Sequence, residues 1–333
     1  MSGHTKAVTL ILRARGLGGL LTALPALRAI RAARPHHHLV LAAPGWLRPI
    51  VELSGCVDEL HATPLVGDLR WNAPAPTSAV NLHDAGPASI TDLLDTEPAQ
   101  LISYRHPDFP RVRGPVWPTR VHETARWCRL LESAGIPADP TDLALAAPAR
   151  SLATRTHVVI HPGAAPARVW PAERFALVAA HLHGAGYRVL VTGTAAEAPL
   201  ARYVAEHAGL PESCVVAGEL TLGQLAATVA GAALVIGGDT GVGHLATAFG
   251  TRSVLIFGPT PPHLSGPPPE RMAHIALWSG RAGDPHSPDP DPGLLSITAI
   301  EVIDAAERQL RGVRREAAYA GAVTETIGVS ELG

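Results

Sequence analysis

The sequence has few cysteines, no long apolar run and no signal-peptide pattern. Its three cysteines, Cys56, Cys128 and Cys214, lie far apart and form no CxxC pair. This argues against a structural zinc site and favours buried thiols in a reducing compartment. No apolar run reaches the roughly 18 residues of a membrane-spanning helix, because Arg13 and Arg15 interrupt the only candidate. We therefore expect a cytoplasmic protein without an integral membrane segment.

The sequence also has no large excess of positive or negative charge. The chain has 27 lysines and arginines against 29 aspartates and glutamates, a formal net charge of −2. This balance excludes a strongly basic nucleic-acid-binding protein and an acidic disordered tail protein. We therefore expect no nucleic-acid partner.

Well-known nucleotide-binding and hydrolase motifs are also missing. The segment Gly16–Leu21 places a leucine where the third glycine of a GxGxxG fingerprint belongs, and there is no Walker A sequence. No Gly-x-Ser-x-Gly elbow is present. These absences argue against a dehydrogenase, a P-loop kinase and a hydrolase of the elbow type.

Short apolar runs alternate with helical patterns twice along the chain, which is typical of βα units with parallel sheets. In the first half we expect strands at 7–12, 38–42 and 79–82, and helices at 20–33 and 46–53. In the second half we expect strands at 158–161, 187–192, 214–217, 233–237 and 253–257, and helices at 171–185, 197–208, 222–230 and 298–311, with one more helix opening after Asp239. Residues 259–292 are rich in proline and glycine and are expected to form loops.

Residues 134–155 contain three prolines and no sustained period, which indicates a linker. A length of 333 residues agrees with about two domains. We expect an α/β fold with two Rossmann-like domains facing each other across a cleft, at 1–150 and 151–315, followed by a tail at 316–333. Parallel sheets bind ligands at the carboxyl ends of their strands, so the cleft is the expected site.

The stretch Gly237–His244 leaves an expected strand and opens a helix. Unpaired backbone N–H groups and the helix dipole favour an anion there, so this turn suits a phosphate or diphosphate. Asp239 fits a sugar hydroxyl better than a phosphate, and His244 can donate to a phosphate oxygen. The alternative is that Asp239 or Thr240 only caps the helix.

Two further loops follow expected strands. In the segment His161–Pro171, the planar guanidinium of Arg168 can neutralise a diphosphate leaving group, or is simply solvated. In the segment Gly193–Glu197, the carboxylate can accept hydrogen bonds from the hydroxyls of a ribose, or only complements the helix dipole. Three such loops on one domain favour a nucleotide-diphosphate site.

These motifs resemble those of glycosyltransferase family 9, the ADP-heptose:lipopolysaccharide heptosyltransferases and their relatives. The segments Asp239–Leu245 and Phe257–Thr260 together resemble the family signature DTGxxHLAAA…FGPT. The loops 161–171 and 193–197 resemble two further motifs, and Arg13, Gly18 and Pro25–Arg28 fit the opening pattern of the family. The likeness runs from about residue 7 to residue 310.

The resemblance implies a GT-B fold, with an acceptor-binding domain at 1–150 and a donor-binding domain at 151–315. It also implies an inverting, metal-independent glycosyltransferase without a cofactor, which moves a heptose-like sugar from an ADP-linked nucleotide-diphosphate donor to an acceptor hydroxyl. The acceptor can be a glycan, a glycolipid or a small molecule. Alternatives are a nucleotide-sugar 2-epimerase of the same fold and a non-catalytic nucleotide-sugar-binding protein.

Carried over residue by residue, the resemblance implies roles on both domains. On the donor side, Arg168 would face the phosphates and Glu197, next to Gly193 and Thr194, would face the ribose. Thr240 and Gly241 would offer backbone N–H groups to the diphosphate, and Asp239 and His244 would flank sugar and phosphate. Leu220 would line the base pocket. The acceptor-side candidates are Arg13, Gly18, Gly19, Thr22 and Asn81.

One position departs from the family's pattern. The family has an aspartate, its proposed general base, directly after the glycine matched by Gly18, whereas this chain has Gly19 there. Inverting displacement needs a group that takes the acceptor's proton, an effect of about 10²–10⁴-fold. We expect His83 or Asp84 to serve as this catalytic base, unless both only cap the following turn. The pair His122–Glu123 is a further candidate, unless it only starts a helix.

Overall fold

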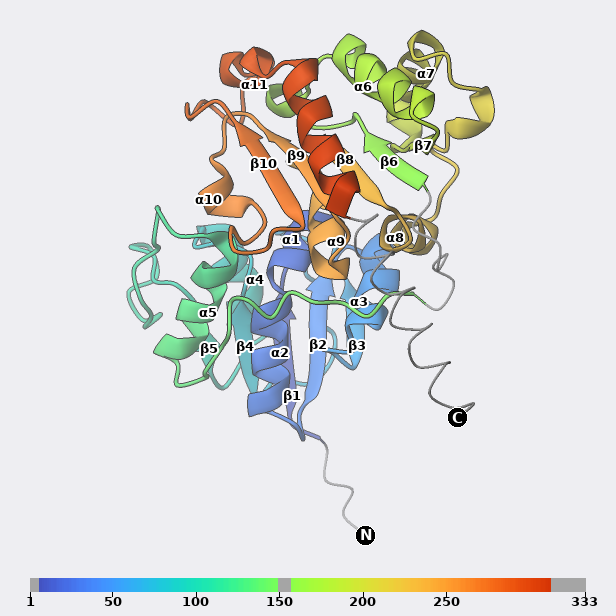
Figure 1. Ribbon diagram of the computed structural model, residues 1–333. Helices are drawn as coiled ribbons and strands as arrows, with labels where there is room; N and C mark the ends of the chain where they lie inside the picture. Colours follow the sequence, from blue (N-terminus) through green and yellow to red (C-terminus); the bar gives the residue numbers. More distant parts are fainter. Residues whose placement is uncertain (1–5, 149–156, 313–333) are drawn as a thin grey trace, which may run out of the picture. The chain divides into compact units, whose positions relative to one another are not determined.

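The computed structural model describes residues 6–148 and 157–312. The chain divides into two compact units, each built around one five-stranded parallel sheet (Figure 1). Unit 1 takes the residues up to 148 together with 221–226 and 263–268, and unit 2 takes the other described residues. The expected linker 134–155 falls partly outside the described residues, and the expected tail 316–333 lies wholly outside them.

The sheet of unit 1 has the strand order β3-β2-β1-β4-β5, so the chain order reverses between β1 and β4. Its strands, blue to teal in Figure 1, are β1 (Val8–Leu12), β2 (His38–Ala43), β3 (Glu59–Ala62), β4 (Ser78–Asn81) and β5 (Leu101–Ile102). Its helices are α1 (Leu17–Thr22), α2 (Leu24–Ala33), α3 (Arg48–Ser54), α4 (Pro87–Leu94) and α5 (Glu123–Ser133), with the 3-10 turn η1 (Gly45–Leu47) before α3.

The three strands predicted in unit 1 are confirmed, but two edge strands escape the sequence prediction. Strand β3 has the sequence Glu-Leu-His-Ala, and β5 is only two residues long. An edge strand has one neighbouring strand and one exposed side, so it needs no continuous apolar run. The periodicity that reveals the central strands is therefore absent from both.

The predicted helix 20–33 is two helices, α1 and α2, which meet at Ala23. Pro25 lies in the first turn of α2, where its missing N–H costs no hydrogen bond, whereas inside a continuous helix it would clash with the preceding turn. The predicted apolar stripe from Leu20 to Ile30 is buried across the break. Gly18 and Gly19 lie inside α1 and not in a loop before it.

The sheet of unit 2 has the order β10-β9-β8-β6-β7, so its chain order reverses between β6 and β8. The strands are β6 (His157–His161), β7 (Arg188–Val191), β8 (Leu234–Gly238), β9 (Ser253–Phe257) and β10 (His274–Trp278). The helices are α6 (Ala172–Gly184), α7 (Ala198–His207), α9 (Gly241–Phe249) and α11 (Pro292–Ser296), and residues 299–312 are also helical. Three 3-10 turns join them: η2 (Pro166–Arg168), η3 (Ala195–Glu197) and η4 (Glu212–Cys214). Two further helices, α8 (Leu222–Ala230) and α10 (Pro262–Ser265), contain residues of both units.

Two predictions in unit 2 are wrong. The expected strand 214–217 is a 3-10 turn, η4, followed by a single β-bridge between Val191 and Val215. Pro211 precedes this turn, and the segment lies beside the edge strand β7, so it forms no ladder. The expected loops at 259–292 contain α10 and the edge strand β10, because the apolar side chains of β10 are framed by prolines and glycines that hide the strand in the sequence.

All three cysteines are free and buried, as the sequence predicts. In unit 2, the indole of Trp170 is 1% exposed and packs edge-on against Phe175, with ring centroids 4.8 Å apart. Its Nε1 donates to the carbonyl oxygen of Ile297, which ties the interior to the end of α11. Among the described residues, no helix has the length and apolar character that crossing a membrane requires.

His274, at the start of β10, makes the stability of unit 2 depend on pH. Burial, with help from Arg271 and Arg252, lowers its pKa from 6.5 to about 4, and its Nε2 is buried without a partner. The folded state therefore favours the neutral ring, so stability is complete above pH 6.5 and falls as the pH drops towards 4. Acidification to about pH 4.5 should remove about 2 to 3 kcal/mol through this residue.

Urea unfolding of His274→Leu at pH 7 and at pH 4.5 checks this expectation. The variant should lose less free energy of unfolding between the two values than the wild-type chain. Replacement of the exposed His286 by leucine is the matched control and should lose as much as wild type. Equal losses in both variants would contradict the role of His274.

Candidate functional site

The predicted site residues lie at the carboxyl ends of strands that flank the order reversals of the two sheets. In unit 1, Arg13 follows β1, and His83 and Asp84 follow β4. In unit 2, the loops after β6, β7 and β8 carry the candidate donor residues, and these three strands are neighbours. Such reversal points are where doubly wound sheets bind ligands.

Arg13 is fully buried and joins four parts of unit 1. Its Nε donates to the carbonyl oxygen of Gly19 (2.8 Å), and its Nη1 donates to that of Leu82 (2.6 Å). Its Nη2 donates to Oγ1 of Thr22 (3.1 Å) and to Oε1 of Glu123 (2.5 Å). Because no part of Arg13 reaches solvent, we assign it a positioning role behind the site.

His83 and Asp84 are neighbours with different exposure. The side chain of His83 is 8% exposed and that of Asp84 31%, and His83 Nε2 lies 3.6 Å from Asp84 Oδ2. Burial lowers the pKa of His83 to about 4, an effect that Arg15 and Arg13 increase and Asp84 opposes. His83 is therefore neutral near pH 7, and Asp84 is the more accessible of the two groups.

The turn that presents Asp84 is held by a buried polar cluster. Asn81 is fully buried, its amide nitrogen donates to the hydroxyls of Ser89 and Ser103, and its oxygen accepts from the backbone N–H of His83. Asp84 Oδ1 accepts from the Ser89 hydroxyl (2.6 Å) and from the N–H of Gly86 (2.8 Å). Asn81 thus supports the turn from behind, and Asp84 Oδ2 lies 3.6 Å from His83 Nε2 and 3.9 Å from Nη2 of Arg15.

The alternative base pair, His122–Glu123, is occupied by structural contacts. His122 caps α5 by accepting from the N–H of Thr124, and its Nε2 lies 2.9 Å from the carbonyl oxygen of Gly266. Glu123 is the ion-pair partner of Arg13. Both residues start a helix, as the second reading of this pair predicts.

A cavity of about 850 Å³ lies beside Asp84 and is lined only by residues of unit 1. The opposite wall is the segment 105–117, which contributes mostly apolar side chains and the cation of Arg105. Val116 is 60% exposed at this wall. The size is that of a small-molecule site, and a carboxylate at its edge can receive a proton from a bound hydroxyl.

Aromatic packing stabilises the wall of this cavity. Trp117 packs edge-on against Tyr104 (5.1 Å between centroids) and Trp127 (5.7 Å). The guanidinium of Arg126 lies 4.5 Å from the ring centroid of Trp117, and that of Arg13 lies 4.8 Å from the ring of Trp127. The cavity wall and the buried Arg13 are therefore parts of one packed cluster.

Gly19 is close to the two arginines that follow β1. A Cβ at this position would lie 2.7 Å from Cβ of Arg15 and 3.4 Å from Nη2 of Arg13. Arg15 also donates from Nε to the carbonyl oxygen of His83 (3.3 Å). A side chain at position 19 therefore requires Arg15 to move. Gly18 precedes it in α1 and is half-buried.

On unit 2, the structure brings Arg168 and Asp239 together. Arg168 lies at the end of η2, and its Nη1 is 3.2 Å from both the carboxylate and the backbone carbonyl of Asp239. Asp239 is 7% exposed, whereas the side chain of Arg168 is 32% exposed and its Nε is buried without a partner. Arg168 therefore has donor capacity left for an anion.

The turn after Asp239 begins α9. Thr240 occupies the N-cap position with extended backbone, but its side chain makes no capping hydrogen bond, and its Oγ1 is buried without a partner. Gly241 is the first helical residue, and His244 is half-buried one turn later. Thr240 is thus the N-cap residue that the alternative named, although its side chain does not bond to the helix. The free N–H groups at this helix end suit an anion.

Glu197 is fixed by its own turn. Its Oε2 accepts from the N–H (2.7 Å) and the hydroxyl (3.0 Å) of Thr194, which forms a capping box. A Cβ on Gly163 would lie 2.2 Å from this carboxylate, and one on Gly193 would lie 3.1 Å from Glu197 Cβ. The absence of a Cβ at both glycines thus leaves space for the Glu197 side chain. Leu220 is half-buried, two residues before α8.

Two contacts of this site escape the sequence prediction. Glu123, a candidate base in the sequence, is instead the ion-pair partner of Arg13, and a buried arginine at the end of an apolar strand is the signal that such a carboxylate exists. A Cβ at Gly163 would collide with the Glu197 carboxylate, and no local sequence pattern around Gly163 predicts this contact. Within the described ranges, no three His, Cys, Asp or Glu side chains come together as a metal site would require.

The chain is similar to known glycosyltransferases in sequence and in fold. The model of glycosyltransferase family 9 (heptosyltransferase) matches residues 120–289, about half of the chain. Lipooligosaccharide heptosyltransferase 2 of Haemophilus influenzae is 31% identical over 126 residues, which are 36% of each chain. The matched part thus spans about a third of the length of that curated relative.

Two solved structures show the same architecture. The family 9 glycosyl transferase of Veillonella parvula superposes with a TM-score of 0.75 at 22% identity, over 92% of this chain and 98% of that one. A heptosyltransferase of Escherichia coli solved with ADP gives 0.66 at 18% identity, over 91% and 99%. At such identities the likeness establishes the fold alone, which is GT-B. With the family model matching residues 120–289, the chain belongs to glycosyltransferase family 9.

Proposed function

We propose that the protein is an inverting glycosyltransferase that moves a heptose-like sugar from an ADP-linked donor to an acceptor hydroxyl. The observation that carries this proposal is the meeting of Arg168, Asp239 and the start of α9 at the carboxyl ends of neighbouring strands. Family membership supports sugar transfer, and the related structure solved with ADP supports that nucleotide.

Unit 2 would bind the donor. Arg168 and the free N–H groups of α9 would meet the diphosphate, and their positive charge would stabilise it as the leaving group without a metal ion. Oε1 of Glu197, which the capping box leaves unused, would accept from a ribose hydroxyl. Asp239 would orient the transferred sugar, His244 would donate to a phosphate oxygen, and Leu220 would contact the base.

Unit 1 would bind the acceptor in the cavity beside Asp84. Asp84 Oδ2 would take the proton from the acceptor hydroxyl. At the same time, the hydroxyl oxygen of the acceptor would form a bond to the anomeric carbon of the sugar, and the bond between that carbon and the diphosphate would break. His83 would support this carboxylate from the buried side. The apolar wall of 105–117 favours a glycolipid or small-molecule acceptor whose hydroxyl lies next to an apolar group.

The donor assignment can be tested with Arg168→Ala and a panel of ADP, UDP, GDP and TDP. At about 100 times its Kd, a ligand stabilises the chain by roughly 2.7 kcal/mol, a rise of several degrees in Tm. We expect a selective rise with ADP in the wild-type chain. Loss of a charged hydrogen bond should weaken ADP binding about 10- to 100-fold in the variant.

The exposed Arg202 of unit 2 provides the matched control, Arg202→Ala, which should keep wild-type ADP affinity. No Tm shift with any of the four nucleotides would overturn the donor assignment. The transfer itself is tested by release of ADP from ADP-heptose: release that requires an acceptor supports transfer, whereas ADP binding without turnover under every acceptor supports a binding protein instead.

A further inference from the structure

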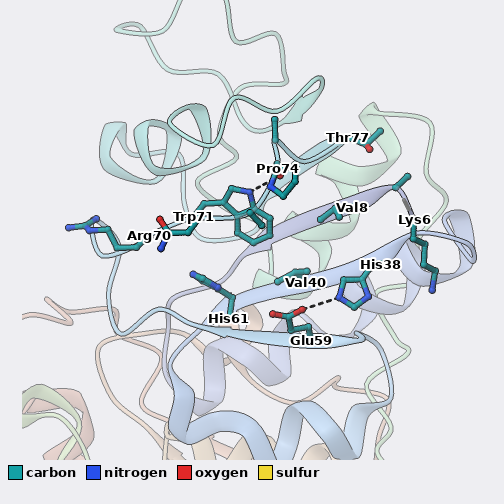
Figure 2. Close-up of a pocket in the computed structure, with 14 residues that line it drawn as sticks. Lys6, Val8, His38, Val40, Glu59, His61, Arg70, Trp71, Pro74 and Thr77 are labelled. Atoms are coloured by element: carbon teal, nitrogen blue, oxygen red, sulfur yellow. Dashed lines mark hydrogen bonds and ion pairs between the residues drawn. The ribbon is translucent and has the colours of Figure 1, made fainter. Parts of the chain in front are cut away.

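The connection from β3 to β4 in unit 1 contains no helix. It runs over residues 63–77, and the two strands that it joins are parallel. Such a crossover usually contains a helix that covers the sheet. Here an irregular segment takes that place and leaves a cavity of about 590 Å³ against β1, β2 and β3 (Figure 2).

The two sides of this cavity are apolar and aromatic. Figure 2 shows Trp71 and Pro74 on one side, and Val40 and Val8 of the sheet on the other. The Trp71 Nε1 donates to the carbonyl oxygen of Pro74 (3.0 Å), and its ring lies against that of His61, with centroids 5.6 Å apart. The indole is therefore held in place before any ligand enters.

Two of the charged groups at the cavity, Glu59 and Arg70, have hydrogen-bond partners within the chain. Glu59 Oε2 lies 3.0 Å from Nε2 of His38, and the guanidinium of Arg70 donates to the carbonyl oxygens of Gly67 and Leu69. Lys6 lines the cavity as well, so the lining carries charges of both signs, two cations and one carboxylate.

Three neutral polar side chains at the cavity have hydrogen-bonding capacity left. The side chains of His61, Asn72 and Thr77 line the cavity and make no hydrogen bond to any other described residue. They supply both donors and acceptors around an aromatic surface. This combination suits a ring that has one apolar face and hydroxyls at its edge.

We propose that this cavity binds a neutral sugar ring, with its C–H face on Trp71 and its hydroxyls towards His61, Asn72 and Thr77. The volume lies within the range of small-molecule sites, about 300–1,000 Å³. The site is distinct from the proposed transfer site. It involves the first residues of β1, β2 and β3, whereas Arg13 and Asp84 follow the carboxyl ends of their strands.

The test uses the full chain with ¹⁵N-labelled tryptophan side chains. The chain has six tryptophans, and Trp71→Phe identifies the indole signal of Trp71 by its loss. Neutral methyl glycosides of glucose, galactose, mannose and a heptose are titrated one by one. We expect at least one to shift the Trp71 signal saturably, and His61→Ala to weaken that binding about tenfold.

Trp46 provides the matched control, because it is 56% exposed in the same unit and does not line the cavity. Trp46→Phe should retain the sugar affinity, and Asn72→Ala, an exposed position, gives a second variant that leaves folding intact. The proposal is overturned if no glycoside moves the Trp71 signal, if only inorganic phosphate or benzoate moves it, or if both His61→Ala and Asn72→Ala bind as wild type does. Titration with ADP on the same sample reports the donor site separately.

Discussion

Asp84→Asn is expected to lower kcat by about 10²- to 10⁴-fold in the proposed transfer reaction, the usual contribution of a positioned general base. The asparagine oxygen can still accept from Gly86 and Ser89, so the turn is preserved while the charge that takes the proton is lost. Donor binding involves only unit 2 residues in our proposal. The Kd for ADP should therefore stay unchanged, and single-turnover kinetics with saturating donor measures the effect on the chemical step.

Two further variants make this expectation specific. Asp108→Asn carries out the same chemical change at a side chain that is 70% exposed and does not line the cavity, so its kcat should match that of wild type. His83→Gln should lower kcat less than Asp84→Asn, because His83 is buried behind the carboxylate. Wild-type kcat in Asp84→Asn, or a larger loss in His83→Gln, would show that Asp84 is not the base.

Arg13→Met is expected to destabilise unit 1 by about 3–5 kcal/mol, the cost of breaking a buried ion pair by removing one partner. The change removes the ion pair with Glu123 and the donors to the carbonyl oxygens of Gly19 and Leu82. The contact over the Trp127 ring is lost as well. Urea unfolding followed by tryptophan fluorescence measures the loss.

A surface pair provides the control for Arg13. Arg48 and Glu52 lie 4.0 Å apart with more than half of each side chain exposed, so Arg48→Met should cost about 0–1 kcal/mol. In the double variant Arg13→Met with Glu123→Leu, the stability loss should be smaller than the sum of the two single losses, since no charge is left buried. A loss for Arg13→Met as small as that of Arg48→Met would contradict the central role of this arginine.

The central strands of both sheets could be predicted because each is a continuous apolar run, as Val8–Leu12 and Ser253–Phe257 show. A central strand is buried on both faces of the sheet, so nearly all of its side chains have to be apolar. The edge strands β3 and β10 are less buried, so their residues carry no such constraint. The break before Pro25 was open to prediction from the proline alone, but the apolar stripe on both sides of it concealed it.

The candidate site likewise has some features that the sequence predicts and others that it does not. The loops after β6, β7 and β8 are local in sequence, so their strand-to-helix pattern points to Arg168, Glu197 and Asp239 directly. The pair of Arg13 and Glu123 joins residues 110 positions apart, and only the fold brings them together. The sequence likewise places His83 beside Asp84, but the difference in their exposure depends on how β4 and its turn pack.

In the proposed donor site, the capping box of Glu197 would affect how tightly a nucleotide is held. The two bonds to Thr194 fix the carboxylate rotamer in the unliganded chain, and Gly163 leaves space beside it. A ribose that binds there does not have to immobilise a free glutamate, which would otherwise cost about 0.5–1.5 kcal/mol. Thr194→Ala would remove the hydroxyl bond but keep the backbone N–H bond to Glu197 Oε2, so the carboxylate would be only partly released and the proposed ribose contact weakened to a small extent.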